Sequence, residues 1–557
     1  MTLRSGGEIL VANLLAQGTT HAFGVPGESF LPVLDALYDV ADRLTFVVCR
    51  QEGGAAYMAD AYGKLTGRPG VAIVTRGPGA SNAAIGIHTA AQDSTPMIVL
   101  VGQVGSDFVD REAFQEIDYR RMYGSSTKWA AQIDRVERIP EYIAHAFRIA
   151  MAGRPGPVVL ALPEDMLAAQ CDARDASRVD ALPIAPTRAQ IAAVGEALAH
   201  AQRPLLLAGG SRWDRDACAT LRLLAERAGL PVACAFRHQD LFDNRHPQYA
   251  GDVGIAINPQ LAARVRDADV LLVVGERLGE MTTSGYALIE APSPHQTLIH
   301  VHPGSDELGR VYQPAIAINA TPREFIEALS ESLPATGCRR DLAQHAQREY
   351  EAWRSPRTVP GDVDLWQVVR WLDERLPDDA IVANGAGNYA TWMHRIFRYR
   401  SYRTQLAPYS GSMGYGVPAA VAAKLVHRDR IVLSWNGDGC FLMNGQELAT
   451  AVQYRLPIVF VVIDNGMYGT IRMHQERQYP DRVSGTSLVN PDFAALARAY
   501  GATGETIAST SQFAPAFERA LAADGPALLH VKLDSQALTP NATLDALREQ
   551  GRNAKKS

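Results

Sequence analysis

Two polar residues in the last third of the chain each follow an apolar, β-rich run. Asp438 comes after the run Ile431–Trp435, and Asn465 follows the run Ile458–Ile463 with Asp464 between them. Because neighbouring parallel strands bring their carboxyl ends to one edge of a sheet, we expect these two side chains to lie close together. A carboxylate oxygen, an amide oxygen and a backbone carbonyl near Met467 would supply half of an octahedral shell of oxygen ligands. Such a shell, completed by diphosphate oxygens and water, suits Mg²⁺.

The glycines beside this carboxylate suit a bound phosphate. Gly437 and Gly439 let the backbone turn sharply and approach a ligand closely, and Cys440 follows them. We expect a helix over Asn444–Gln453, and a helix start offers free backbone N–H groups to a phosphate. A single Gly-Asp-Gly is most often an ordinary strand-end turn, so the second strand end is needed to favour a binding site.

The pair resembles the signature of thiamine-diphosphate enzymes, in which Gly-Asp-Gly is followed by an Asn about 25 residues later. In this chain 25 residues, 440–464, separate Gly439 from Asn465. The signature often ends in Asn-Asn, whereas this chain has Asp464-Asn465. The resemblance implies thiamine diphosphate and Mg²⁺ as cofactors. The residues that it implies for the diphosphate and the metal are Gly437, Asp438, Gly439, Cys440, Asn465 and Met467.

Thiamine diphosphate also needs a carboxyl group held against its ring nitrogen N1′ in a dry site. The protonated ring lets the 4′-amino group become an imine that removes the proton from C2, and desolvation favours the protonated carboxyl. Glu52 stands just after the apolar run Leu44–Val48, and Gly53 and Gly54 leave room for a large ring. Taken alone, Glu52 is more often a solvated carboxylate at the positive end of a helix.

The sequence around Glu52 resembles the large subunit of the acetolactate synthase family, and the resemblance covers residues 1–540 or so. Further motifs that carry it are Phe23-Gly24-Val25-Pro26-Gly27, Gly77-Pro78-Gly79-Ala80-Ser81-Asn82, Asp93-Ser94-Thr95-Pro96, Gly102-Gln103-Val104 and Ala113-Phe114-Gln115-Glu116. The resemblance implies that Glu52 is the catalytic carboxyl at N1′. It also implies active sites between subunits, with Glu52 of one chain facing Asp438 and Asn465 of another, and hence a homodimer or homotetramer.

A third stretch that resembles the family begins at Gly411 and continues through Met413 to Ala420. In the family an apolar side chain here wedges between the two rings of the cofactor. Met413 fits this wedge, and Gly411 would lend its carbonyl to the 4′-amino group. The alternative is a glycine-rich turn into a helix, with Met413 in the core. Asn388 falls where the family contacts the diphosphate, although acetolactate synthases have Gln-His-Gln in this region.

Three residues are candidates for contact with the substrate. Arg76 stands where acetolactate synthases have a small Ser, and a guanidinium beside the cofactor could grip a carboxylate with two hydrogen bonds. A structural ion pair is an equal alternative for Arg76. Gln115 lies in one of the resembling motifs. His474 stands where those enzymes have a Trp that helps to select the second 2-oxoacid, which argues against branched-chain acetolactate synthesis.

The middle of the chain departs from the flavin site of the resembling enzymes. Their Arg-Phe-Asp-Asp-Arg run is replaced by Arg277-Leu278-Gly279-Glu280-Met281, and their His-Ile-Asp-Ile-Asp run by His300-Val301-His302-Pro303-Gly304. The acidic groups that would meet ribose hydroxyls are missing. We therefore expect no bound FAD. His300 and His302 alternate on one predicted strand, where they are expected to be ordinary strand-end histidines.

Apolar runs that alternate with helix-like segments must position these residues. Strands that are apolar on both faces are typical of parallel sheets covered by helices on both sides. The runs are Leu44–Val48, Val71–Thr75, Met97–Val101, Val158–Leu162, Pro204–Ala208, Val232–Ala235, Val270–Val274, Thr297–Val301, Ala380–Ala383, Ile431–Trp435, Ile458–Ile463 and Ala527–Leu533.

The chain is thus predicted to be an α/β protein with three doubly wound parallel-sheet domains. The predicted domains are a pyrimidine-binding domain over 1–168, a Rossmann-like central domain without a clear nucleotide site over 188–334, and a diphosphate- and Mg-binding domain over 360–540. Polar stretches at 168–189 and 333–363 are the predicted linkers. The similar order of elements in the first and last thirds is compatible with an old duplication.

Composition excludes several classes of protein. Of the 557 residues, 47% are hydrophobic and 20% charged, which predicts folded domains, and the net charge of −6 comes without a basic run for nucleic acid. No apolar run reaches the ~20 residues that span a membrane. The six cysteines are far apart, which argues against a zinc site or a disulfide framework. The N-terminus does not read as a signal peptide, so a cytoplasmic location is expected.

The leading hypothesis is an enzyme that decarboxylates a pyruvate-like 2-oxoacid and joins the product to a second carbonyl compound, an aldehyde or a 2-oxoacid. Within the same cofactor class, a simple 2-oxoacid decarboxylase, a benzaldehyde-lyase-type enzyme and a 2-hydroxyacyl-CoA lyase stay open. A non-catalytic cofactor-binding protein is a rival from another class, but mere binding does not need Glu52. A nucleotide-dependent oxidoreductase would want Gly-x-Gly-x-x-Gly after an early strand, and Gly77-Pro78-Gly79 continues differently.

Overall fold

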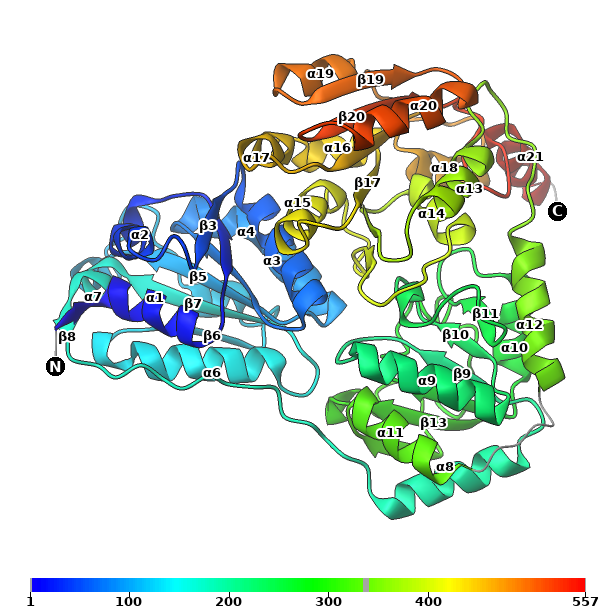
Figure 1. The fold of residues 1–557 in the computed structure, drawn as a ribbon, viewed down its shortest axis with the longest axis horizontal. Helices are drawn as coiled ribbons and strands as arrows, with labels where there is room; N and C mark the ends of the chain where they lie inside the picture. The colour runs from blue at the N-terminus through cyan, green and yellow to red at the C-terminus, as the bar shows by residue number, and fades with distance from the viewer. Residues whose placement is uncertain (1–2, 334–339, 556–557) are drawn as a thin grey trace.

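The structure is a computed structural model that describes residues 3–333 and 340–555. In this part of the chain, three six-stranded parallel sheets follow one another, each flanked by helices (Figure 1). The three doubly wound α/β domains predicted from the sequence are therefore confirmed. Residue 334, the predicted end of the central domain, and Cys338 lie outside the described residues.

The N-terminal domain is built on the sheet order β3-β2-β4-β5-β7-β6. Its strands are β2 His21–Gly24, β3 Thr45–Val48, β4 Gly70–Val74, β5 Met97–Gln103, β6 Trp129–Gln132 and β7 Pro157–Pro163. Its helices are α1 Gly6–Ala16, α2 Leu31–Tyr38, α3 Glu52–Thr66, α4 Gly77–Asp93, α5 Tyr119–Tyr123, α6 Ile139–Met151 and α7 Glu164–Ala168. A two-stranded antiparallel ribbon joins β1 Arg4–Ser5 to β8 Gln170–Cys171.

The central domain has the order β11-β10-β9-β12-β13-β14, which is a dinucleotide-fold order. Its strands are β9 Leu205–Ala208, β10 Val232–Cys234, β11 Tyr249–Asp252, β12 Val270–Val274, β13 Thr297–His302 and β14 Ile316–Asn319. Its helices are α8 Arg188–His200, α9 Arg215–Ala228, α10 Pro259–Asp267, α11 Pro322–Ser332 and α12 Arg340–Trp353, of which α12 packs against β11.

The C-terminal domain has the order β16-β15-β17-β18-β20-β19. Its strands are β15 Ile381–Asn384, β16 Gln405–Leu406, β17 Val432–Gly437, β18 Val459–Asp464, β19 Thr503–Ile507 and β20 Ala527–Lys532. Its helices are α13 Leu365–Arg375, α14 Asn388–Ile396, α15 Gly416–Val426, α16 Asp438–Asn444, α17 Glu447–Gln453, α18 Gly469–Gln478, α19 Phe493–Ala499, α20 Thr510–Leu521 and α21 Leu544–Ala554.

The first and last domains share one topology. Numbered within each domain, both sheets run in the order 2-1-3-4-6-5, whereas the central sheet runs 3-2-1-4-5-6. The shared order agrees with the duplication that the similar order of elements allowed. It also makes α3 and α15 equivalent, because each follows the second strand of its domain.

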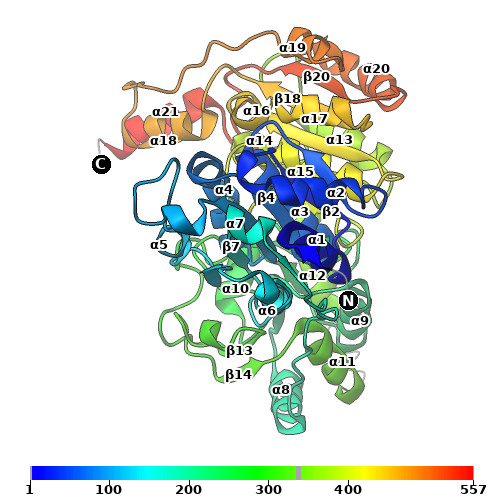
Figure 2. The same ribbon diagram turned by 90° about the vertical axis from the view of Figure 1, so that its left-hand side faces the viewer.

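Helices α3 and α15 pack against each other and join the two similar domains within one chain (Figures 1 and 2). Small side chains such as Ala55, Ala59, Ala419 and Ala420 are fully buried in one continuous core that includes both helices. Helix α3 is buried on almost all sides because α15 covers the face that its own sheet leaves free. Among residues 3–333 and 340–555, no helix is both long and apolar enough to cross a membrane.

Candidate functional site

A cavity of about 230 Å³ lies where strands β15, β17 and β18 end. Strands β15 and β17 are neighbours although β16 comes between them in the chain, so the strand order reverses here. Open α/β sheets bind ligands at such a reversal. Helices α14, α16 and α18 all begin at this edge, which brings backbone N–H groups and positive helix ends to the cavity.

The cavity brings together most of the residues that the sequence singled out. Those that line it are Asn388, Gly411, Met413, Gly437, Asp438, Gly439, Cys440, Asn465 and Met467. The predicted positions of Asp438 and Asn465 are also found, since each directly follows one of the paired strands β17 and β18. One prediction about the local structure is wrong. The helix expected over Asn444–Gln453 begins already at Asp438, and the segment to 453 forms two short helices, α16 and α17.

Asp438 is held rigidly at the floor of the cavity, with an exposed fraction of 4%. Its Oδ1 accepts a hydrogen bond from the N–H of Gly439 at 2.8 Å, and its Oδ2 accepts one from the N–H of Gly466 at 2.9 Å. Burial raises the pKa of this carboxyl above its ordinary value, and the carboxylate of Asp464 nearby adds to the rise. A cation would relieve both effects, so the position suits a metal ligand.

Sequence reasoning missed Asn490, which links the two acidic groups. Its Nδ2 donates to Asp438 Oδ2 at 2.8 Å and to Asp464 Oδ1 at 2.7 Å, while its buried Oδ1 has no hydrogen-bond partner in the described chain. Burial opposes ionisation of Asp464, but hydrogen bonds from His530, Lys532 and Asn490 hold its pKa below the ordinary value. Asn490 lies in a loop far from the signature, so no spacing in the sequence points to it.

The loop that carries Met413 is fixed by contacts from two directions. Gly411 and Gly414 have φ values of 69° and 81°, a backbone region that favours glycine. The hydroxyl of Tyr57, on α3, lies 2.5 Å from Ser412 Oγ and donates to the carbonyl of Met413 at 3.2 Å. The side chain of Met413 therefore stands at the cavity wall, on a loop that the N-terminal domain of the same chain supports.

Cys440 and Asn388 connect the surrounding helix starts. The N–H of Gly414 and the hydroxyl of Tyr389 donate to Cys440 Sγ at 3.1 and 3.0 Å, and burial raises the pKa of this thiol. Asn388 accepts a hydrogen bond from Thr470 through its Oδ1 at 3.0 Å, which joins the beginnings of α14 and α18. Both residues hold the wall of the cavity in place.

The oxygen groups at this edge fit a magnesium diphosphate. Asp438 supplies a carboxylate, Asn465 an amide and Met467 a backbone carbonyl, and the helix starts supply N–H groups. The described part of the chain holds no group of three or more His, Cys, Asp or Glu side chains placed to bind a metal by themselves. A metal held partly by a ligand's phosphates needs no such group.

Glu52 lies in the N-terminal domain of the chain and is not among the residues that line this cavity. It begins α3 with an exposed fraction of 8%, and its Oε2 accepts a hydrogen bond from Asn82 Nδ2 at 2.9 Å. Glycine is needed at Gly79, where a Cβ would lie 2.9 Å from the side chain of Thr75. The same Cβ would lie 3.2 Å from Glu52 Oε1, so Gly79 lets the start of α4 pack closely against the Glu52 carboxylate.

Glu447 is a second residue that sequence reasoning missed. This carboxylate of α17 is fully buried, and its Oε1 accepts the backbone N–H groups of Arg50 and Gln51, both at 3.0 Å. Its Oε2 accepts the hydroxyl of Thr450 at 2.6 Å. Glu447 therefore holds the two residues that precede Glu52.

The three candidate substrate residues lie outside the cavity. Arg76 forms an ion pair with Glu164 at 2.8 Å, which is the alternative to a grip on a substrate carboxylate. The Nε of Arg76 has no hydrogen-bond partner in the described chain. Gln115 has a φ of 66°, and its carbonyl accepts the N–H of Gly77 at 3.1 Å. His474 is exposed on α18. The structure does not bring these three residues together with Asp438.

Comparison with known proteins follows the same division into domains. Three domain families of the thiamine pyrophosphate enzymes match the chain in order. They are the N-terminal TPP binding domain over residues 4–122, the central domain over 191–329 and the C-terminal TPP binding domain over 385–531. The acetolactate synthase isozyme 2 large subunit of Escherichia coli (strain K12) is 32% identical over 533 residues, which cover 95% of this chain and 96% of that protein.

Two further relatives extend this result to distant organisms. A probable acetolactate synthase large subunit of Methanocaldococcus jannaschii is 33% identical over 555 residues, covering 96% of this chain and 93% of that protein. The acetolactate synthase large subunit of Corynebacterium glutamicum is 32% identical over 533 residues, covering 93% and 84%. The chain therefore belongs to the thiamine pyrophosphate enzyme family, with the acetolactate synthase large subunits among its relatives.

Proposed function

We propose that this thiamine-diphosphate enzyme decarboxylates a 2-oxoacid of the pyruvate type and joins the two-carbon product to a second carbonyl compound. The observation that carries the proposal is that Asp438, Asn465 and Met413 line one cavity. The relatives of the chain are named acetolactate synthases, which supports the same reaction. Thiamine diphosphate, when bound, supplies the carbanion and the electron sink for such chemistry.

The residues of the chain would position this cofactor. Asp438, Asn465 and the carbonyl of Met467 would hold Mg²⁺, and the helix starts beside Asn388 and Gly439 would hold the diphosphate. Met413 would wedge between the rings, and Gly411 would accept a hydrogen bond from the amino group. The cavity walls consist largely of glycine and apolar side chains.

The decisive experiment is a product assay. The purified protein is incubated with thiamine diphosphate, Mg²⁺ and single 2-oxoacids or pairs of them, and the products are identified by mass. Acetolactate from pyruvate supports the proposal. Release of free aldehyde alone would make the chain a simple 2-oxoacid decarboxylase, and no turnover of any 2-oxoacid would refute the proposal.

We further propose that Glu52 serves the cavity of a second copy of the chain. This is supported by its position in the N-terminal domain, away from the residues that line the cavity of its own chain. Apolar side chains are exposed near Glu52 and near the cavity. They are Ile85 on α4 and Leu442 and Met443 on α16, and such a contact would bury them.

Mixing two inactive variants tests this arrangement. Glu52→Gln and Asp438→Ala subunits are unfolded and refolded together, or co-expressed with different tags. If sites form between subunits, some mixed dimers contain one intact site, and activity reappears. Failure of a verified mixed dimer to regain any activity would exclude shared sites.

FAD is the cofactor that we propose the enzyme lacks. The strand order of the central sheet reverses between β9 and β12, where dinucleotides bind in such sheets. The loops after β9 and β12 approach each other closely at this place: a Cβ at Gly210 would lie 1.9 Å from the carbonyl oxygen of Gly275. The buried carboxylate of Glu276 accepts hydrogen bonds there from Thr282 and Tyr409 at 3.0 and 3.1 Å.

Another cavity beside the central domain, of about 730 Å³, is a further candidate place for a nucleotide. Its Arg154 and Arg310 are both paired with Glu307, at 2.7 and 3.0 Å, which leaves less positive charge for phosphates. An absorption spectrum of freshly purified protein decides the question. Flavin bands near one equivalent per chain would show that the proposal is wrong.

A further inference from the structure

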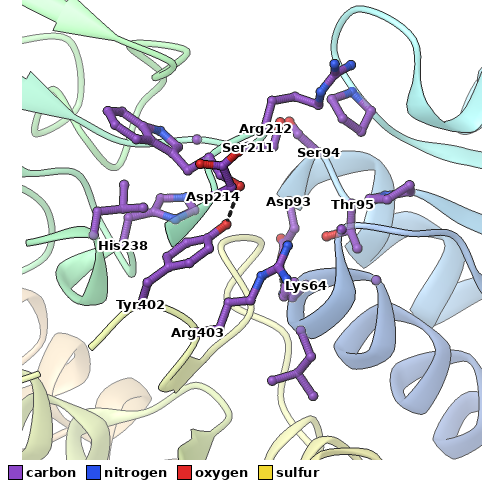
Figure 3. Close-up of a pocket in the computed structure, with 18 of the residues that line it drawn as sticks. Lys64, Asp93, Ser94, Thr95, Ser211, Arg212, Asp214, His238, Tyr402 and Arg403 are labelled. Atoms are coloured by element: carbon purple, nitrogen blue, oxygen red, sulfur yellow. Dashed lines mark hydrogen bonds and ion pairs between the residues drawn. The ribbon is translucent and has the colours of Figure 1, made fainter. Parts of the chain in front are cut away.

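Three charged side chains of the N-terminal domain form a cluster where this domain meets the C-terminal domain. The ammonium group of Lys64, on α3, lies 2.8 Å from a carboxylate oxygen of Asp60 and 2.5 Å from one of Asp93, at the end of α4. Figure 3 shows Lys64 and Asp93 close together beside the segment that carries Arg403. Asp60 is fully buried, and Asp93 has an exposed fraction of 8%. None of the three residues lines the cavity that holds Asp438.

Stability alone does not explain this cluster. Burial opposes the charge of Lys64, but the carboxylates of Asp60 and Asp93 hold the pKa of its ammonium group above the ordinary value. Because desolvation offsets much of the attraction within a buried ion pair, apolar side chains of similar size often stabilise a protein as well. The hydrogen bonds of the cluster indicate what else it does.

These hydrogen bonds converge on one segment of the C-terminal domain, residues 407–415. Asp93 accepts the backbone N–H groups of Tyr409 and Ser410, both at 2.9 Å. Lys64 donates to the carbonyl of the first residue of the segment at 3.3 Å. The cluster therefore holds the beginning of this segment against the N-terminal domain.

The end of the same segment is held by the same helix. The hydroxyl of Tyr415 donates to Asp60 Oδ2 at 2.6 Å, and the ammonium group of Lys64 lies 4.6 Å from the centre of the Tyr415 ring. The ring of Tyr57 packs edge-on against this ring, with 5.3 Å between the ring centres. Met413, which lines the cavity, lies between the two ends that the cluster holds.

The segment has little backbone support of its own. Residues 407–415 form neither helix nor strand, so no ladder of backbone hydrogen bonds fixes their place. Gly411 and Gly414, on either side of Met413, allow more backbone conformations than other residues would. The central domain contacts the segment through the hydrogen bond from Tyr409 to Glu276 at 3.1 Å, which lies before both glycines. The position of Met413 therefore depends on side chains of the N-terminal domain.

We propose that Lys64, together with Asp60 and Asp93, forms a positioning centre that fixes Met413 against the rings of the cofactor. The inference rests on the proposed function, in which Met413 wedges between these rings. Lys64 is the counter-charge for two carboxylates that hold opposite ends of the segment. Without it the carboxylates repel each other and the segment can shift, while Asp438 and the helix starts that hold the diphosphate stay in place.

Two measurements on a Lys64→Met variant test the proposal, since Met keeps the apolar stem and removes the charge. In the cofactor-free protein, hydrogen exchange of the Tyr409 and Ser410 amides should become about tenfold faster. In the protein saturated with thiamine diphosphate and Mg²⁺, exchange of the C2 proton should slow by ~10²-fold, the effect of a misplacement of about 1 Å. The Kd of the cofactor should change by less than about threefold, because the groups that hold the diphosphate are untouched.

Further variants separate positioning from a loss of stability. Lys64→Arg keeps the charge and should restore both exchange rates. Asp93→Asn leaves the pair of Lys64 and Asp60 intact and removes one acceptor, so it should show both effects even if Lys64→Met does not fold. Tyr402→Phe is the matched control, because the Tyr402 hydroxyl also crosses a domain boundary, to the carbonyl of Trp213 at 2.7 Å, but does not contact the segment.

The outcomes are distinct. Exchange of the C2 proton at the wild-type rate in a folded Lys64→Met or Asp93→Asn protein would overturn the proposal, and so would equal slowing in Tyr402→Phe. Because neither exchange measurement uses a 2-oxoacid, a failure of the proposed 2-oxoacid reaction would leave this test unaffected.

Discussion

Replacing Glu447 by Ala should disturb both the folding of the Glu52 segment and the rate of the enzyme. The change removes the acceptor of two backbone N–H groups, those of Arg50 and Gln51, and of the Thr450 hydroxyl. A hydrogen bond to a charged group contributes about 1.5–3 kcal/mol, so the two backbone bonds together are worth about 3–6 kcal/mol. Because Arg50 is exposed and water can replace part of this loss, the lower value is expected.

Hydrogen exchange of the peptide that contains Arg50 and Gln51 measures this loss directly. At 1.4 kcal/mol for each factor of ten, 3 kcal/mol corresponds to a loss of protection of ~10²-fold. Loss of these contacts should also let Glu52 shift. A shift of about 1 Å at a reacting group usually lowers the rate by ~10²-fold, so we expect kcat to fall by this factor.

Glu447→Gln is the control, since its amide oxygen can still accept both N–H groups, and it should recover most of the protection. If the Ala variant exchanges these amides and turns over at the wild-type rate, Glu447 does not position Glu52.

Three further outcomes are expected. Glu52→Gln should leave cofactor binding intact but slow exchange of the C2 proton of thiamine diphosphate by ~10²–10⁴-fold, as followed by NMR; exchange at the wild-type rate would remove Glu52 from the mechanism. Asp438→Ala should abolish the Mg²⁺ dependence of cofactor retention in equilibrium dialysis, and unchanged retention would mean that the metal lies elsewhere. Burial raises the pKa of Asp240 to about 6, above its unfolded value of about 4. Between these values the folded state holds a proton that the unfolded state has lost, so wild-type stability should fall as the pH rises from about 4 to about 6. This loss should reach about 3 kcal/mol relative to the Asp240→Asn variant, which has no charge to titrate at this position. The melting temperatures of both proteins are measured against pH, and parallel profiles of wild type and variant would contradict the prediction.

Apolar patterning finds most central strands and misses most edge strands, although the edge strand β3 is found as Leu44–Val48. Strands such as β17 and β18 are buried along their whole length, so they appear in the sequence as continuous apolar runs. Strands β6, β14 and β19 are sheet edges with partly exposed side chains, as in Thr503–Ile507, and no apolar run marks them. The internal strand β2 was also missed, because its ends, His21 and Gly24, leave only two apolar residues in a row.

The site divides in a similar way. Residues whose role is tied to a strand end, such as Asp438 and Asn465, can be predicted because the spacing between strands fixes their place. Asn490 and Glu447 act through contacts between segments distant in sequence, and a single chain contains no local signal for such contacts. The role of His474 stays a prediction: it comes from counting along the chain from Asn465, and the side chain is exposed on α18 in the single chain.

The shared topology of the first and last domains is compatible with the proposal that one chain carries two different halves of a site. Both domains present a helix start after the third strand, Gly77 of α4 in one and Asp438 of α16 in the other. The C-terminal copy has an acidic residue there, with Asn465 after the next strand, and suits a metal diphosphate. The N-terminal copy has glycine there, and its carboxylate, Glu52, lies one helix earlier. Since α3 and α15 cover each other within the chain, the remaining faces of both domains are free to meet those of another copy.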